Sequence, residues 1–422
     1  MEGLPAPTVS LEESGAVALA IQAPATAASG THLLTARWPS GRQGTLRLSI
    51  GPTLPLASGI GEPDDVVVAP DGSVVVTDLK SNSIRQVLAG HSVRTLLSGL
   101  NVPEGVAIDG ADSLVFAEQG TNRVLRWSSR LGLRELLQLP VHPGVEGIDG
   151  LSIASPAGTQ VVLVPDSAGG RVLVAQMDTG ITSPIPGHWQ RPTDAVLHGD
   201  QVYMVDEYGG RMWLGPINGP LHALGPPLSL PDDVVVGSDG TAFVNELSGT
   251  ILAIRPNGQA TPLLQGLHNP QGLALDGAEN LILVESDTAR ISTYVRSCVP
   301  LLLGDTAARL HTGGPAAVVA IGSDCVPGSS PPSFMLAPGS LWPAPGAASG
   351  IWGGAPGSTT TTLSNGVTAS LLPGASPGAA LVMLRPSSGP DHTGSAVDAV
   401  LEVRQRTGVG AIPVQITTQV LP

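Results

Sequence analysis

Short apolar runs separated by turn residues follow one another along residues 52–298 in a repeating order. A proline or valine followed by acidic or amide residues opens each repeat, and an alternating strand comes next. A second apolar strand then ends in a polar side chain, and Gly, Pro and Asp punctuate the gaps. Period-two alternation bounded by such turn signals favours antiparallel β structure. The openings begin at Pro63, Pro103, Val145, Pro192, Pro231 and Pro270, and the polar ends are Asp78, Glu118, Asp166, Asp206, Asn245 and Glu285.

The repeat length predicts the architecture. Successive polar ends are 40, 48, 40, 39 and 40 residues apart. A unit of about 40 residues with four short antiparallel strands is typical of a propeller blade, so six repeats predict an all-β, six-bladed β-propeller. The sixth repeat lacks an outer strand, and the run TLPLASGI at 53–60 has the pattern of the missing copy. We therefore expect an N-terminal strand to close the ring and remove its free edge.

Both chain ends contain further strand-like runs, and the stretch 326–365 is rich in Gly, Pro, Ser and Thr, which favours loop. If strand 53–60 closes the ring, residues 1–51 and 299–422 leave from the same blade. We therefore predict that they build one β-sandwich-like accessory domain beside a propeller of residues 52–298. Cys298 and Cys325 could form one disulfide or remain two buried thiols, and the spacing leaves both open.

Composition narrows the function classes. Lys and Arg number 20 against 34 Asp and Glu, and the net charge of −14 argues against a nucleic-acid binder. An apolar fraction of 42% excludes a disordered chain, and no uninterrupted apolar run is long enough to span a membrane. The sequence contains no clear signal peptide, so the compartment stays open, with an extracellular or periplasmic location favoured over the cytoplasm. We expect a monomer.

Acidic residues at the repeat openings supply the candidate chemistry. In an up-and-down blade the start of the first strand lies at the same end as the end of the second, so these side chains should ring one mouth of the channel. Converging oxygen ligands suit Ca²⁺, but the same charges could simply repel one another. The polar ends of the second strands recur in every repeat, which favours a turn-closing role for them. The ring comprises Asp64, Glu104, Glu146, Asp194, Asp232 and Gln271, with Asp65 and Asp233 beside it.

The segments DLKSNSI (78–84) and EQGTNRV (118–124) carry a family resemblance. The repeats resemble NHL-type six-bladed propellers and, beyond them, the gluconolactonase (senescence-marker protein) and strictosidine-synthase-like superfamily. The resemblance covers about 250 of the 422 residues and concerns architecture more than activity.

Similarity to the gluconolactonases implies one divalent ion in the channel, which polarises a lactone carbonyl and activates water. The positions that best match its ligands are Glu104, Glu146, Asp194 and Asp232. Several repeats have Pro-Asp-Asp or Pro-Thr-Asp where that family has Pro-Asn-Gly or Pro-Asp-Gly. His142 and His188, in loops entering first strands, are the general-base candidates.

Three functions remain open from the sequence. The leading one is a binding scaffold that recognises a small molecule or a protein through the acidic channel face. The second is a Ca²⁺-dependent lactone or ester hydrolase of the gluconolactonase-like type. The third is an extracellular structural or interaction module, which the loop-rich accessory domain supports.

Overall fold

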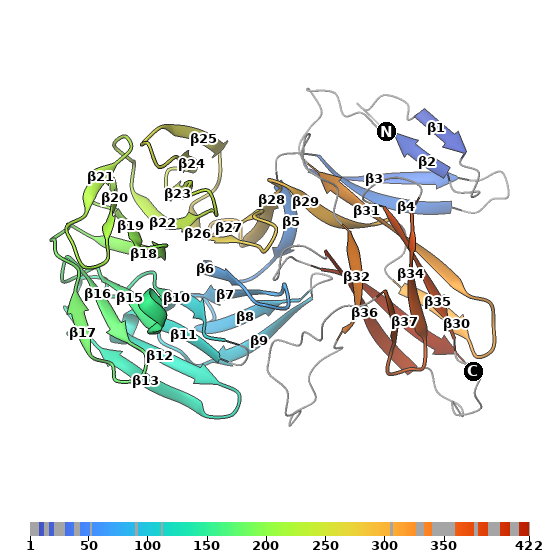
Figure 1. The fold of residues 1–422 in the computed structure, drawn as a ribbon, viewed down its shortest axis with the longest axis horizontal. Coiled ribbons are helices and arrows are strands. Elements are labelled where there is room, and N and C mark those ends of the chain that lie inside the picture. Colours follow the sequence, from blue (N-terminus) through green and yellow to red (C-terminus); the bar gives the residue numbers. More distant parts are fainter. Residues whose placement is uncertain are drawn as a thin grey trace. The chain divides into compact units, whose positions relative to one another are not determined.

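The computed structural model shows an all-β chain, which confirms the predicted fold class (Figure 1). The chain divides into two compact units, Met1–Pro55 and Leu56–Pro422. None of the described helices is long and apolar enough to cross a membrane. The structure describes residues 8–11, 17–20, 30–37, 43–50, 53–88, 92–110, 113–303, 307–325, 333–339, 359–374, 379–386, 397–405 and 413–421.

The first unit contains two small antiparallel sheets. β1 (Thr8–Leu11) pairs with β2 (Val17–Ala20), and β3 (Gly30–Arg37) pairs with β4 (Gln43–Ile50). The described strands before residue 51 hydrogen-bond only to one another. An accessory domain shared by both chain ends therefore stays a prediction.

The second unit begins with six consecutive four-stranded antiparallel sheets, numbered here in chain order (Figure 1). The first three are β6 (Pro63–Val68), β7 (Val74–Asp78), β8 (Ser83–Val87) and β9 (Val93–Ser98); β10 (Pro103–Ile108), β11 (Ser113–Glu118), β12 (Arg123–Ser128) and β13 (Gly132–Gln138); and β14 (Ser152–Ala154), β15 (Val161–Asp166), β16 (Arg171–Gln176) and β17 (Thr182–Pro184). The last three are β18 (Pro192–His198), β19 (Gln201–Asp206), β20 (Arg211–Pro216) and β21 (His222–Leu224); β22 (Pro231–Val236), β23 (Ala242–Glu246), β24 (Thr250–Ile254) and β25 (Ala260–Gln265); and β26 (Pro270–Leu275), β27 (Leu281–Glu285), β28 (Arg290–Tyr294) and β5 (Thr53–Ser58).

The six sheets form a closed ring. The first strand of each sheet contacts the first strand of the next, and β26 of the sixth sheet contacts β6 of the first. β5 is the outer strand of the sixth sheet, where the sequence lacks a fourth strand of its own. Leu56 and Ala57 are buried in one cluster with Ile291 of β28, so apolar packing holds this closing strand.

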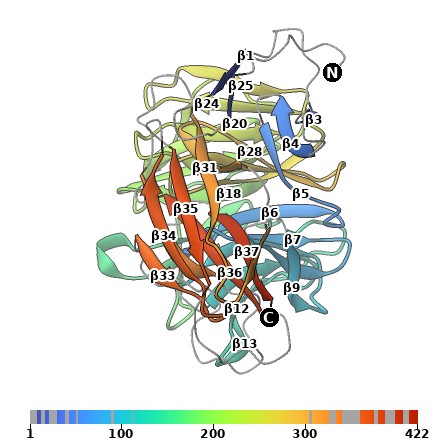
Figure 2. The ribbon, with the colours of Figure 1, turned by 90° about the vertical axis from the view of Figure 1, so that its right-hand side faces the viewer.

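Two further sheets follow β28 and share one core. The first has the order β29 (Cys298–Leu303), β31 (Ala317–Cys325), β35 (Ala380–Arg385), β34 (Thr368–Pro373) and β33 (Thr360–Thr362), and Figure 2 shows the middle three strands side by side. The second has the order β30 (Ala307–His311), β37 (Val414–Leu421), β36 (Val397–Gln405) and β32 (Phe334–Gly339), and β30 runs parallel to β37. Ile321 and Val382 of the first sheet are buried in one cluster with Leu401 and Ile416 of the second. The two sheets therefore pack as a sandwich.

Two sequence predictions fall on this sandwich. The stretch 326–365, expected to be loop, contains β32 and β33, and residues 326–332 and 340–358 lie outside the described part. The ladder of β29 and β31 places Cys298 directly opposite Cys325. Opposite positions on antiparallel strands have the Cα separation that a disulfide requires. The disulfide itself stays a prediction.

Gly272 offers a test of the junction that closes the ring. A Cβ atom at this position would lie 2.5 Å from the carbonyl oxygen of Asp64 in the first sheet. We expect Gly272→Ala to force β26 and β6 apart and to lower the free energy of unfolding by about 1–3 kcal/mol, measured by urea denaturation. Gly237→Ala is the matched control, because its Cβ would come no closer than 3.3 Å to a neighbour. Equal stability of the two variants would contradict the tight junction.

Candidate functional site

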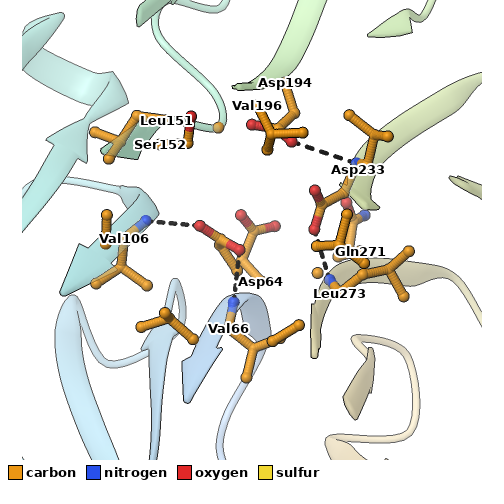
Figure 3. A pocket seen from close by; sticks show the side chains of 18 of the residues that line it. Asp64, Val66, Val106, Leu151, Ser152, Asp194, Val196, Asp233, Gln271 and Leu273 are labelled. Atoms are coloured by element: carbon orange, nitrogen blue, oxygen red, sulfur yellow. Dashed lines mark hydrogen bonds between the residues drawn. The ribbon is translucent and has the colours of Figure 1, made fainter. Parts of the chain in front are cut away.

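A β-bulge near the start of the first strands places neighbouring side chains in the same channel. In the first sheet Pro63 lies opposite Asp78 but Val66 lies opposite Val76, so the first strand holds one extra residue. The second, fourth, fifth and sixth sheets have a bulge at the equivalent place. Consecutive side chains of a regular strand point to opposite faces, and a bulge breaks this alternation. Asp64 and Asp65 consequently both line the central cavity. Figure 3 shows Asp64 there.

Three carboxylates tie adjacent sheets together at the bulges, and we call Asp65, Asp194 and Asp233 the bridging carboxylates; Asp194 is buried and the other two are half-buried. Asp65 accepts hydrogen bonds from the N–H groups of Val66 and Val106, both at 2.6 Å, and thus joins the first sheet to the second.

The other two bridging carboxylates act in the same way (Figure 3). Asp194 accepts from the N–H of Val234 at 3.3 Å, and Asp233 accepts from the N–H of Leu273 at 2.5 Å. These bonds join the fourth sheet to the fifth and the fifth to the sixth. Buried backbone N–H groups need such partners, so these carboxylates have a structural task.

Glycines occupy the equivalent position in the remaining sheets. The N–H of Gly105 donates to the carbonyl oxygen of Asp149 at 2.7 Å, and that of Gly150 donates to Thr193 at 2.8 Å. Gly272 approaches the backbone of the first sheet, as described above. Each junction of the ring therefore uses either a carboxylate or a glycine. A carboxylate accepts a hydrogen bond from an N–H group of the next strand, whereas a glycine leaves room for the two backbones to touch.

Asp64, Glu104 and Asp149 form a second acidic group, which we call the triad. One oxygen of each lies within 4.8 Å of the others, and the three come from the first, second and third sheets. Asp64 and Glu104 are buried, and Asp149 is largely so. Glu104 and Asp149 share a hydrogen bond, and the Gln119 amide donates to Glu104.

Arg191 is the basic side chain that meets this group. Its Nη2 lies 2.7 Å from Asp149 Oδ2 and 2.6 Å from Glu146 Oε2, and its Nη1 pairs with Glu207. Burial lowers the pKa of Arg191, but the charges of Asp149, Glu146 and Asp232 outweigh that effect and raise it. The guanidinium is therefore charged and already shared among three carboxylates.

The acids of this region are held at raised pKa values. Burial raises the pKa of Asp64, Glu104 and Asp232 well above the ordinary range, and the neighbouring charge of Asp149 raises it further. Burial also raises the pKa of Asp149, against the opposing effects of Arg191 and of the hydrogen bond with Glu104. A desolvated carboxylate among others of the same charge binds protons, or any other cation, more readily than one in water.

The bridging carboxylates are perturbed for the same reasons. Burial raises the pKa of Asp65, Asp194 and Asp233. Asp194 and Asp233 also share a hydrogen bond, which raises the pKa of Asp233 and lowers that of Asp194. A proton shared between these two groups would relieve their repulsion.

The central cavity has an acidic part and an apolar part. Its volume is about 300 Å³, and first-strand residues of all six sheets line it. The carboxyl groups and Gln271 come from the bulges, and Val68, Ile108, Ile153 and Leu275 come from farther along the same strands.

Glu146, expected in the acid ring, lies outside the triad. Its side chain is 59% exposed and pairs with Arg191. The repeat opening of the third sheet is Ile148-Asp149-Gly150-Leu151, three residues later than the sequence prediction, and Asp149 takes the expected place. The segment Val145-Glu146-Gly147-Ile148 resembles Pro103-Glu104-Gly105-Val106 even more closely, so the repeat pattern by itself pointed to Glu146.

The other predicted acids divide between the two groups. Asp64 and Glu104 belong to the triad, and Asp65, Asp194 and Asp233 are the bridging carboxylates. Asp232 lines the cavity close enough for its charge to act on Glu104, and Gln271 lines it too.

Neither candidate histidine lies in the acidic group. His142 and His188 are both exposed, and neither lines the central cavity. His188 lines a separate cavity instead.

The acids that end the second strands close loops. Asp78 accepts from the N–H of Glu62 at 3.1 Å and from the Ser81 hydroxyl at 2.6 Å. In the fifth sheet Glu246 lies opposite Pro231 and accepts from Ser229, so Glu246 rather than Asn245 is the equivalent residue. Such hydrogen bonds are the turn-closing role that the sixfold recurrence predicts.

Comparisons with known proteins give structural neighbours. No family and no curated protein matches the chain. Similar solved structures are a gluconolactonase from Xanthomonas campestris (15% identity, 57% of this chain and 88% of that one, TM-score 0.49), virginiamycin B lyase from Staphylococcus aureus (18%, 58% and 88%, 0.43) and the calcium-binding protein regucalcin from Agrobacterium tumefaciens (11%, 57% and 94%, 0.47). They include the gluconolactonase group that the repeats resemble.

The raised pKa values predict a stability that falls as pH rises. Between the ordinary carboxyl pKa of about 4 and the higher values in the fold, the folded chain binds more protons than the unfolded chain. The free energy of unfolding therefore decreases through that window. In EDTA we expect a higher melting temperature at pH 5 than at pH 7.5, and a smaller difference for Asp64→Asn. An unchanged difference in that variant would contradict the assignment to the triad.

Proposed function

We propose that this chain is a binding scaffold that holds a divalent cation with Asp64, Glu104 and Asp149 and recognises an oxygen-bearing ligand through the acidic end of its channel. The observation that carries the proposal is the convergence of these three buried carboxyl groups within 4.8 Å. Ca²⁺ is the favoured ion, because it takes six to eight oxygen ligands in flexible geometry.

Charge balance supports the proposal. Three triad carboxyls and the nearby Asp232 face one guanidinium, and Arg191 already contacts Glu146 and Glu207 as well. Two unit charges 4 Å apart interact by about 4 kcal/mol at an effective dielectric constant of 20, so an uncompensated cluster is costly and a divalent ion relieves it.

The coordination number of Ca²⁺ explains why a ligand would bind beside the ion. Three monodentate carboxylates leave several positions of Ca²⁺ for water or for ligand oxygens. A small molecule or a protein side chain with carboxyl, carbonyl or hydroxyl groups is the class of ligand that fits.

Calcium should stabilise the protein through the triad. At a hundredfold excess over the dissociation constant, a ligand of the native state adds about 2.7 kcal/mol to the free energy of unfolding. We expect Ca²⁺ to raise the melting temperature of the wild type by several degrees in calorimetry. Asp64→Asn should lose that shift, and in EDTA it should melt above the wild type because one repelling charge is gone.

Asp178→Asn is the control, since it removes the same charge from an exposed side chain outside the triad. It should keep the full calcium shift. No calcium shift in the wild type, together with a stabilised Asp64→Asn, would mean that the triad is mere repulsion and would overturn the proposal.

A second candidate function is a metal-dependent hydrolase of a lactone or ester. The hydrogen-bonded pair of Glu104 and Asp149 favours it, because a carboxyl pair with raised pKa values can move a proton at neutral pH. In this role the ion would polarise the carbonyl, and one member of the pair would accept a proton from water.

Lactone hydrolysis separates the two candidates. If the chain is a hydrolase, the wild type with Ca²⁺ should open a small lactone faster than buffer does, and Glu104→Gln should lower kcat by about 100-fold or more. Titration of the released acid measures this rate. Calcium binding without any turnover would leave the scaffold function and exclude the hydrolase for that substrate class.

A further inference from the structure

A second cavity lies between the loop that enters β18 and the turn that follows β19. Its volume is about 520 Å³, and it is lined by residues different from those of the central cavity. Trp189 belongs to the entering loop, Tyr208 to the turn, and Trp213 to β20. None of these residues takes part in the proposed cation site.

The aromatic content of this cavity is exceptional for the chain. The whole sequence contains six Trp, three Tyr and three Phe among 422 residues, yet three aromatic side chains meet here. Trp189 is 5% exposed and packs edge-to-face on Trp213, with ring centroids 6.4 Å apart. A Cβ atom at Gly187 would lie 2.4 Å from the Trp189 ring, so this glycine lets the loop backbone reach the indole. The wall is therefore preformed, while Tyr208 stays 59% exposed at its edge.

Some polar groups around the aromatic wall already have hydrogen-bond partners, and others are exposed. The Asp206 carboxylate is largely engaged, because its oxygens accept from the N–H groups of Gln190, Arg191 and Gly209. Gln190 is exposed beside it, as is His188. Trp213 Nε1 is buried, and among the described residues it has no acceptor. The cavity thus combines an apolar platform with exposed polar side chains at its edge.

The charged groups beside the cavity favour a neutral ligand over a cationic one. The Arg191 guanidinium lies 5.3 Å from the centre of the Tyr208 ring, so its positive charge disfavours a second cation beside that ring. Three backbone hydrogen bonds occupy three of the roughly four lone pairs of the Asp206 carboxylate, which leaves at most one for a ligand hydroxyl. A neutral ring with an apolar face and hydroxyl groups at its edge meets both requirements of the cavity.

We propose that this cavity is a carbohydrate site, in which the ring face of a neutral saccharide stacks on Tyr208 and the Trp189–Trp213 wall. Its hydroxyl groups would pair with Gln190 and His188 at the edge of the cavity. Apolar platforms with a few polar groups that fix orientation are typical of small-molecule sites.

Calorimetric titration of the full chain in EDTA tests the site without the cation. The probes are glucose, galactose, mannose and N-acetylglucosamine, with choline as the cationic comparison. We expect at least one saccharide to bind and choline not to bind. Tyr208→Ala should weaken that saccharide by about tenfold, because one stacking aromatic is lost. Leu131→Ala, which removes another exposed apolar side chain outside the cavity, should leave the affinity unchanged.

Three results would overturn the proposal: no saccharide of the panel binds, Tyr208→Ala leaves the affinity unchanged, or choline binds in their place. Asp64→Asn separates this site from the cation site. If the saccharide site is real, its affinity persists in that variant even when calcium binding is lost.

Discussion

Six first strands meet around one axis, and each contacts the next near its start, where five of the six strands carry a bulge. There is no room for an ordinary side chain at this point, and the buried N–H groups of the next strand need acceptors. Carboxylates meet the requirement at Asp65, Asp194 and Asp233, where each accepts a hydrogen bond across a junction. Glycines meet it elsewhere by letting backbones touch, as the N–H of Gly105 does with Asp149. Ring closure therefore depends on having either Asp or Gly at the junction position of each first strand.

This constraint concentrates negative charge in a buried place. The bridging carboxylates use their oxygens for backbone groups, and Asp194 and Asp233 also share a hydrogen bond. Among the described residues no backbone N–H donates to a triad carboxylate, and Arg191 offsets only part of the triad's charge. The bridging carboxylates and the triad thus lie close together near the starts of the first strands, and their hydrogen-bond partners distinguish them better than their residue type does.

Sequence reasoning could find the repeats because each copy has the same turn residues and the same period-two strands. It could also place β5, since the sixth repeat visibly lacks an outer strand. Sequence reasoning did not align the third and fifth repeats correctly with the others. Insertions in the third repeat made Glu146 look like the repeat opening, although Asp149 holds that place. In the fifth sheet the acid opposite the opening proline is Glu246, one residue beyond the predicted Asn245. A slip of one or three residues is invisible to a pattern but exchanges one polar side chain for another.

The sequence by itself determined the all-β class, the repeated strand pattern, the closing strand and the gathering of acids at the repeat openings. These properties are local, because apolar periodicity and turn chemistry act over a few residues. The tertiary structure alone decided which acids meet, which ones bridge the sheets, and that Trp189, Tyr208 and Trp213 share one cavity. The reason is that a bulge and a closed ring bring together residues from different sheets, and no local pattern records the distance between them.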